Sequence, residues 1–199
     1  MRVKQTEVGM NAENRAILAR GMVVACIAMV AVVAASNWLV QYPINDFLTW
    51  GALTYPVSFL VTDLTNRAFG PARARQVVYV GFALGVALSV WLADWRIAAA
   101  SGTAFMAGQL LDISIFDRLR RSSWWRAPLA SSVLGSIVDT ALFFSLAFAG
   151  TDVPWVTLAL GDLAVKLVLA LLFLAPFRAL MAAVAPFSGM AAPGPTSGR

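Results

Sequence analysis

The sequence predicts an all-α membrane protein, a compact bundle of six transmembrane helices with both termini in the cytoplasm (N-in/C-in). Of the 199 residues, 60% are hydrophobic and 13% are charged, and the mean hydropathy is +0.76. Soluble domains are about a quarter charged. Apolar runs close to the ~20 residues that span a bilayer recur along the chain. Lysine and arginine gather on alternate connections, which is how membrane proteins fix their orientation.

Six apolar segments are expected to be the helices, and because their connections are short, consecutive helices should be antiparallel neighbours. They lie at about 18–40, 47–67, 76–95, 97–118, 128–149 and 154–177, which makes 18–177 the transmembrane domain. Residues 1–17 are expected to form a cytoplasmic arm. Residues 178–199 end in "GMAAPGPTSGR" and are expected to be a disordered cytoplasmic tail, because Pro- and Gly-rich stretches bury little apolar surface.

The orientation follows from the distribution of basic residues. One side of the predicted membrane has only Arg96, and Lys166 falls inside the sixth segment. Because cytoplasmic connections carry the excess of basic residues, the remaining thirteen are placed in the cytoplasm. They are Arg2, Lys4, Arg15, Arg20, Arg67, Arg73, Arg75, Arg118, Arg120, Arg121, Arg126, Arg178 and Arg199.

A cleaved signal peptide is the competing interpretation of the first segment, because "VVAAS" at 32–36 resembles a cleavage site. The apolar run continues to Val40, however, and removing it would leave an odd number of spans. A retained first helix is therefore favoured.

Several classes of protein are excluded by what the sequence lacks. The chain has one cysteine, Cys26, and no histidine, so a disulfide framework and a cysteine metal site are excluded and the usual general base is missing. It has no Walker A, G-x-S-x-G or H-E-x-x-H motif, so no enzyme activity and no cofactor are expected. The short basic clusters indicate membrane topology rather than nucleic-acid binding. A carrier, a channel or a binding subunit remains.

Polar side chains from four predicted helices fall near one level of the bilayer. A charged group inside a span costs several kcal/mol unless it is paired or faces a wet cavity, so each is a functional hypothesis. Transporters keep substrate sites at the midplane. Depth, at ~1.5 Å per residue, places these residues near the midplane: Tyr55, Pro56, Gln109, Asp112, Asp139, Asp162 and Lys166, with Asp63 closer to the cytoplasm.

Helical spacing groups these side chains into pairs. Asp162 with Lys166 and Asp63 with Arg67 are each four residues apart, so each pair shares a helix face. The first pair, or Lys166 with Asp139, is open to a purely structural interpretation, and Asp63 with Arg67 to that of a helix-end pair. Asp112 differs, because no basic residue shares its turn. Three glycines should permit close helix approach: Gly102, Gly108 and Gly135.

Five stretches in order resemble the bacterial queuosine precursor transporters, a family earlier described as vitamin-uptake membrane proteins. The resemblance covers about residues 35–177, while the N-terminal arm and C-terminal tail match nothing in the family. The stretches are "ASNWLVQYP" at 35–43, "TWGALTYPVSFLVTDLTNRAFG" at 49–70, "GQLLDISIFDRLRR" at 108–121, "WWRAPLASSVLGSIVDTALFFSLAF" at 124–148 and "GDLAVK" at 161–166.

The resemblance implies uptake of 7-cyano- and 7-aminomethyl-7-deazaguanine across the bacterial inner (cytoplasmic) membrane by a multi-pass protein. A guanine-like edge presents an N–H and an amino group that one carboxylate accepts together. The ring carbonyl needs a donor, and the flat ring needs an aromatic face. The candidate acids are Asp63, Asp112, Asp139 and Asp162, the polar candidates Asn37, Gln41, Gln109 and Lys166, and the aromatic candidates Tyr55, Phe59 and Phe105.

Pro56, Asn66 and Arg67 are candidates for a gate or a structural ion pair. Two modes of action stay open: a secondary carrier, and a membrane subunit that binds a vitamin or nucleobase and needs a separate energising module. Proton coupling through one of the carboxylates and assembly as a homodimer are also left open. Neutralising Asp112 or Asp139 is expected to abolish uptake while the protein still inserts.

Overall fold

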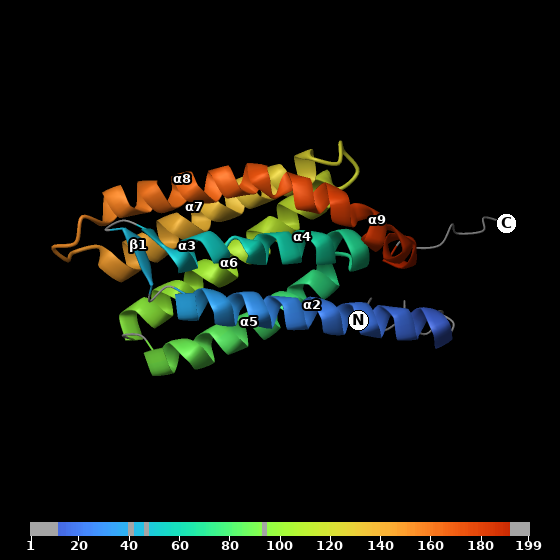
Figure 1. Cartoon of the computed structure of the whole chain (residues 1–199), viewed down its shortest axis with the longest axis horizontal. Helices are drawn as coiled ribbons and strands as arrows, with labels where there is room; N and C mark the ends of the chain where they lie inside the picture. The colour runs from blue at the N-terminus through green and yellow to red at the C-terminus, as the bar shows by residue number, and fades with distance from the viewer. Residues whose placement is uncertain (1–11, 40–41, 46–47, 93–94, 192–199) are drawn as a thin grey trace.

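The computed structural model describes residues 12–39, 42–45, 48–92 and 95–191, and in them it confirms the all-α fold. The long helices lie side by side along the bundle, and the start of α2 and the end of α9 lie toward the same end (Figure 1). A two-stranded antiparallel hairpin, β1 (Pro43–Asn45) with β2 (Leu48–Thr49), follows α2. The helices are α2 (Ala12–Leu39), α3 (Trp50–Thr54), α4 (Val57–Phe69), α5 (Pro71–Leu92), α6 (Trp95–Leu119), α7 (Arg126–Phe148), α8 (Trp155–Leu172) and α9 (Leu174–Ala191).

Three of the described helices are both long enough and apolar enough to cross a membrane: Asn14–Leu39, Arg126–Phe148 and Trp155–Leu172. Helices α5 and α6 have 22 and 25 residues. At ~1.5 Å per residue they extend about 33 and 38 Å, which is also enough to span the hydrocarbon core. The count of six spans and the N-in/C-in orientation stay predictions.

The second predicted segment is broken rather than continuous. Proline has no N–H to donate to a helix, and the chain forms two helices on either side of Tyr55 and Pro56. The backbone continues across the break through shorter-range bonds, from Ser58 N to Tyr55 O at 2.9 Å and from Phe59 N to Pro56 O at 3.1 Å. The break leaves Tyr55 between two helices, with its side chain directed into the bundle.

The prediction of a disordered tail over 178–199 is wrong for residues 178–191, which belong to α9. Leu174, Phe177 and Met181 recur at helical spacing and give α9 an apolar face. Phe177 is 1% exposed and packs edge-on against Phe116 of α6 at a centroid distance of 6.1 Å. Disorder was predicted from the prolines and glycines near the end of the chain, and the apolar pattern that precedes them was not taken into account. Residues 192–199 lie outside the described part of the chain.

The N-terminal boundary also differs, because α2 begins at Ala12 and not at residue 18. The arm predicted over 1–17 therefore includes the first turns of a helix. Residues 1–11 lie outside the described range, so the rest of the arm is untested.

Helices α6 and α7 cross where each has a glycine. A Cβ added to Gly108 would lie 2.9 Å from the Cβ of Asp139 and 3.1 Å from the carbonyl oxygen of Gly135. A Cβ added to Gly135 would lie 2.8 Å from a ring carbon of Phe59 and 3.3 Å from the Cβ of Asp112. The predicted close approach at these two glycines is confirmed, and it sets the positions of two acidic residues.

Gly108→Ala is therefore expected to destabilise the protein. Overpacking a tight contact costs about 1–3 kcal/mol, which exceeds the gain of at most about 1 kcal/mol from replacing glycine in a helix. The matched control is Gly161→Ala on α8, whose added Cβ would meet nothing within 4 Å. The midpoint of thermal unfolding in detergent should fall for Gly108→Ala and stay level or rise for Gly161→Ala. Equal midpoints for the two variants would contradict this packing argument.

Candidate functional site

Lys166 of α8 lies at the centre of a buried polar group that we call the lysine cluster: Tyr55, Asp139, Thr140, Asp162 and Lys166. The Lys166 ammonium is 2.8 Å from Asp139 Oδ2 and 2.5 Å from Asp162 Oδ2. It also donates to Thr140 Oγ1 at 3.0 Å, and that hydroxyl donates to Asp162 Oδ2 at 2.8 Å. Lys166 therefore pairs with both acids at once, Asp139 and Asp162. With two carboxylates and one ammonium, the cluster has a formal net charge of −1.

Tyr55 joins the cluster to an aromatic wall. Its hydroxyl donates to Asp139 Oδ1 at 2.9 Å, and the Lys166 ammonium lies 5.4 Å from the centroid of its ring. The ring also meets Phe59 of α4 and Phe105 of α6 edge-on, at centroid distances of 6.4 and 6.2 Å. The structure thus brings all three predicted aromatic residues to one place.

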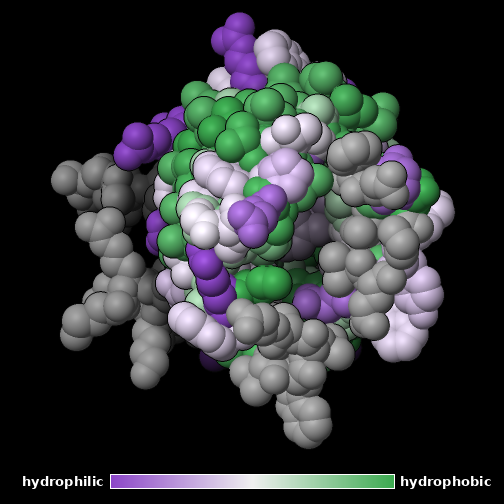
Figure 2. All heavy atoms as spheres, turned by 90° about the vertical axis from the view of Figure 1, so that its left-hand side faces the viewer, coloured by the Kyte–Doolittle hydropathy of each residue, from purple (hydrophilic) through white to green (hydrophobic). Residues whose placement is uncertain are grey.

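Asp162 is the most accessible acid of the cluster. Its side chain is 17% exposed, against 5% for Asp139. Within the described residues its Oδ2 takes the bonds from Lys166 and Thr140, while no bond reaches Oδ1. The end of the bundle that carries β1 is hollowed near its centre (Figure 2).

Gln109 of α6 lies between the lysine cluster and the ends of α4 and α6. Its Oε1 accepts a bond from Thr62 at 2.6 Å, and its Nε2 donates to Ser58 at 2.9 Å. All three residues are fully buried. Both ends of the amide are therefore held by α4, and Gln109 ties α4 to α6. Ser58 and Thr62 were missed from the sequence, although their four-residue spacing on one helix face was a usable signal.

Asp63 of α4 and Asp112 of α6 form what we call the carboxyl pair. The bonds from Thr62 to Gln109 and from Asn66 to the Ile113 carbonyl hold these parts of α4 and α6 side by side. Asp63 accepts hydrogen bonds from Ser131 at 3.1 Å and from Ser132 at 3.3 Å, both on α7. Asp63 is 2% exposed and Asp112 is 0% exposed. Neither carboxylate oxygen of Asp112 has a hydrogen-bond partner within the described residues. The predicted isolation of Asp112 from basic residues is confirmed in that range.

The C-terminal ends of α4 and α6 are joined by two arginines. Arg67 donates to the carbonyl of Arg120 at 2.8 Å, and Arg120 donates to the carbonyls of Asn66 and Arg67 at 2.7 and 3.3 Å. A guanidinium is favourable at a helix C-terminus, where the carbonyls have no partners in the helix. Burial lowers the pKa of Arg120, but arginine stays charged in proteins. Asp63 is bonded to α7, which does not support the interpretation of Asp63 and Arg67 as a simple helix-end pair.

Two predicted residues are not placed in the site. Asn37 donates to the Val33 carbonyl of its own helix at 2.9 Å, and Gln41 lies outside the described residues. Asn66 lies near the C-terminal end of α4, where its side chain donates to the Ile113 carbonyl of α6 at 3.0 Å.

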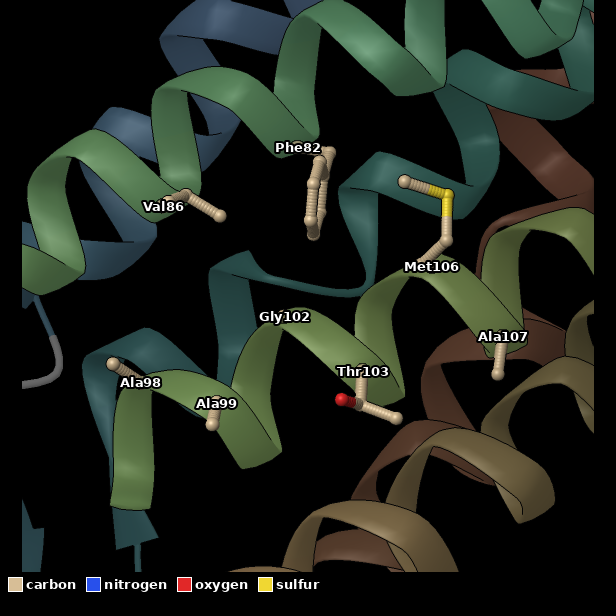
Figure 3. Close-up of a pocket in the computed structure, with 8 residues that line it drawn as sticks. All are labelled: Phe82, Val86, Ala98, Ala99, Gly102, Thr103, Met106 and Ala107. Carbon is tan, nitrogen blue, oxygen red and sulfur yellow. The ribbon is translucent and has the colours of Figure 1, made fainter. Parts of the chain in front are cut away.

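A separate pocket of about 640 Å³ opens between α5 and α6 (Figure 3). Thr103 is the one residue with a polar side chain in its lining, and none of the predicted site residues contributes to it. A lining of this kind suits hydrocarbon better than a guanine-like edge. Its residues are Phe82, Val86, Ala98, Ala99, Gly102, Thr103, Met106 and Ala107.

Comparison with known proteins identifies the family. Residues 49–94 and 89–181 match the family model described as "Putative vitamin uptake transporter". The chain is 35% identical over 174 residues to "Queuosine precursor transporter" of Escherichia coli (strain K12) and 36% identical over 186 residues to "Probable queuosine precursor transporter" of Haemophilus influenzae. Each alignment covers 73% of this chain and 79% of the relative.

A Bacillus subtilis (strain 168) protein, also "Probable queuosine precursor transporter", is 26% identical over 157 residues, which cover 63% of this chain and 68% of that protein. No solved structure matches the chain. These relatives are named as transporters and not as enzymes. Because the family model matches most of the chain and two relatives exceed 30% identity over most of their own length, the chain belongs to the queuosine precursor transporter family.

Proposed function

We propose that this protein is a secondary transporter that imports queuosine precursors, 7-cyano- and 7-aminomethyl-7-deazaguanine, across the bacterial inner membrane. Membership of the family, with two relatives above 30% identity, is the observation that carries the proposal. The apolar helices support a membrane location. Six spans with both termini in the cytoplasm and a substrate site within the bundle belong to the proposal.

The lysine cluster and its aromatic wall are proposed as the substrate site. One carboxylate accepts both the ring N–H and the amino group of a 7-deazaguanine, and Asp162 Oδ1 is the accessible acceptor. Lys166 reduces the formal charge of the cluster to −1 without substrate. When substrate is bound, its ammonium exchanges the bond to Thr140 for one to the ring carbonyl. Tyr55, Phe59 and Phe105 supply ring contacts, and stacking of a base on an aromatic side chain is worth about 1–3 kcal/mol.

The break at Tyr55–Pro56 is proposed as the moving part of the transporter. Broken helices recur at transporter substrate sites, where the halves can move separately. Here α4 holds Gln109 through Ser58 and Thr62 and is tied to α6 through Arg67 and Arg120. Opening toward the cytoplasm would separate the ends of α4 and α6, so the bonds between Arg67, Arg120 and Asn66 would form the inner gate.

Ligand binding tests the substrate class directly. Purified protein is expected to bind the two 7-deazaguanines at least about tenfold more tightly than guanine or biotin, a difference of about 1.4 kcal/mol. Isothermal calorimetry or a thermal-shift titration in detergent gives the comparison. Equal affinity for guanine would contradict the proposed substrate class, and preferential binding of biotin would favour the vitamin-uptake description instead.

A binding subunit that depends on a separate energising module is the second candidate, because the matching family model is described in terms of vitamin uptake. Reconstitution separates the two candidates. A secondary transporter accumulates or exchanges labelled base in liposomes that contain this protein alone. A binding subunit retains the ligand affinity but moves no base across the bilayer.

A further inference from the structure

Among the residues that the structure describes, no cation pairs with the carboxyl pair, which is a buried acidic site. Asp63 comes from α4 and Asp112 from α6, and their exposed fractions are 2% and 0%. The groups that bond to the pair are hydroxyls, Ser131 and Ser132 of α7. Both oxygens of Asp112 lack a hydrogen-bond partner within the described residues. A charged carboxylate in that state is unfavourable in free energy. Even an uncharged polar group that is buried without a partner loses its hydration, and no new hydrogen bond offsets that loss.

The cations of the neighbouring helices are engaged elsewhere. Arg67 of α4 and Arg120 bond to carbonyls at the helix ends, Lys166 of α8 bonds to two other acids, and Arg178 of α9 stacks on Trp124. Arg73 of α5 donates to the carbonyl of Phe69, and Arg15 and Arg20 of α2 are exposed. The other acids on these elements are Asp117 near the end of α6, Asp139 of α7 and Asp162 of α8.

We propose that Asp63 and Asp112 bind one exchangeable proton between them and that this proton is carried with the substrate. Two adjacent carboxylates in a dry interior do not both stay ionised, because each charge is desolvated and each repels the other. One shared proton removes a charge and supplies the O–H donor that the oxygens of Asp112 lack. The inference rests on the proposed transport function and gives it a driving ion.

The position of the pair suits proton release toward the cytoplasm. Asp63 is six residues from the end of α4 and Asp112 seven from the end of α6, or about 9–11 Å along each helix. Tyr55, at the break before α4, precedes Asp63 by eight residues, and Asp139 follows Ser131 by eight residues on α7. Eight residues correspond to about 12 Å along a helix. The proton site and the substrate site are therefore separate layers of one bundle.

Packing connects the two layers. Phe59 contacts the ring of Tyr55 in the lysine cluster and also lies against Gly135, beside the Cβ of Asp112. Gln109, one helical turn from Asp112, bonds to Ser58 and Thr62 on the helix that carries Asp63. A movement of α4 at the Pro56 break would thus change the substrate site and the carboxyl pair together. Such a movement would expose the pair to one side of the membrane at a time and couple one proton to each substrate.

The test uses full-length protein in liposomes that contain a pH-sensitive dye. With an imposed pH gradient, wild-type protein is expected to accumulate labelled 7-cyano-7-deazaguanine, and addition of unlabelled base is expected to acidify the lumen. Asp112→Asn and Asp63→Asn should each abolish the acidification and the accumulation, while exchange of labelled for unlabelled base continues at a rate within about threefold of wild type. Asp152→Asn, an exposed acid in the α7–α8 connection, is the matched control and should behave as wild type.

Three other outcomes would overturn the coupling proposal. Acidification that persists in both variants places the proton elsewhere, and exchange without acidification in wild-type protein shows that transport is not proton-coupled; the proposed function survives both results. Loss of ligand binding by folded Asp112→Asn protein would assign Asp112 to the substrate site instead. If wild-type protein neither binds nor exchanges the base, the proposed function itself fails. If Asp112→Asn does not fold, Asp63→Asn and the wild-type acidification assay decide the question.

Discussion

Asp139→Asn is expected to lower the initial rate of uptake by at least about thirtyfold. The carboxylate bonds to Lys166 at 2.8 Å and to Tyr55 at 2.9 Å, so its charge holds the ammonium and the aromatic ring in place. Removing one partner of a buried charged pair typically costs 2–5 kcal/mol in recognition, and about 2 kcal/mol is a thirtyfold change. Uptake of labelled 7-cyano-7-deazaguanine by cells that produce the variant measures the effect, with the amount of inserted protein determined in the same cells.

Two comparisons make this result interpretable. Asp152→Asn removes an exposed acid of the α7–α8 connection and is expected to leave uptake unchanged. Asp162→Asn leaves the bond between Lys166 and Asp139 intact but removes the accessible acceptor, so uptake is expected to fall while the protein stays well folded. Near-normal uptake by Asp139→Asn, at normal levels of inserted protein, would show that the lysine cluster is not the substrate site.

The fold was largely predictable because the signals for membrane helices are local. Hydropathy and length place α5, α6 and α7 within about five residues of their observed ends, since a run of apolar residues needs no partner to be recognised. The break at Tyr55–Pro56 was less predictable, because a proline inside a membrane helix is compatible with either a kink or two helices. Helix α9 was missed because its apolar face is stabilised by contact with Phe116 of a distant helix.

The candidate site was predictable in composition but not in pairing. Polar and charged residues inside an apolar segment are easily recognised, because burying them in a membrane is unfavourable. This signal identified four residues that the structure brings together: Asp139, Asp162, Lys166 and Tyr55. Their partners depend on how helices rotate and cross, which spacing along one helix does not determine. Thus Asp63 bonds to two serines of α7, although the residue at helical spacing from it is Arg67. Thr140 was missed for a different reason: a threonine hydroxyl inside an apolar helix is too common to indicate a site.

The distribution of charge explains why the bundle has two polar layers rather than one. The described interior holds four acids, Asp63, Asp112, Asp139 and Asp162, and two bases, Lys166 and Arg73, of which Arg73 donates to the Phe69 carbonyl. Lys166 neutralises one of the two acids beside it, which leaves an accessible acceptor for a ligand. It bonds to neither of the other two, and in the coupling proposal those two share a proton. In the two proposals made above, a single lysine in this position divides the acids into a layer that would recognise a substrate and a layer that would carry a proton.

Lys166→Met is expected to destabilise the protein by about 3–5 kcal/mol, the usual consequence of removing one partner from a buried ion pair. The change leaves Asp139 and Asp162 close together without a cation, and it makes the formal charge of the cluster more negative, from −1 to −2. Methionine keeps the length and apolar character of the lysine stem, so the loss is electrostatic rather than steric. The midpoint of thermal unfolding of purified protein in detergent, with the yield of inserted protein, gives the measurement.

A compensating change separates stability from transport. Lys166→Met combined with Asp139→Asn returns the formal charge to −1 and is expected to recover most of the lost stability, because a buried pair replaced as a unit is often neutral in free energy. Uptake should remain lost, because the site then lacks both the Lys166 ammonium and the Asp139 carboxylate that holds Tyr55 in place. If Lys166→Met alone is as stable as wild type, the ammonium is not needed to neutralise these acids. If the double variant both folds and transports, the lysine cluster has a structural role alone, and the substrate is recognised elsewhere in the bundle.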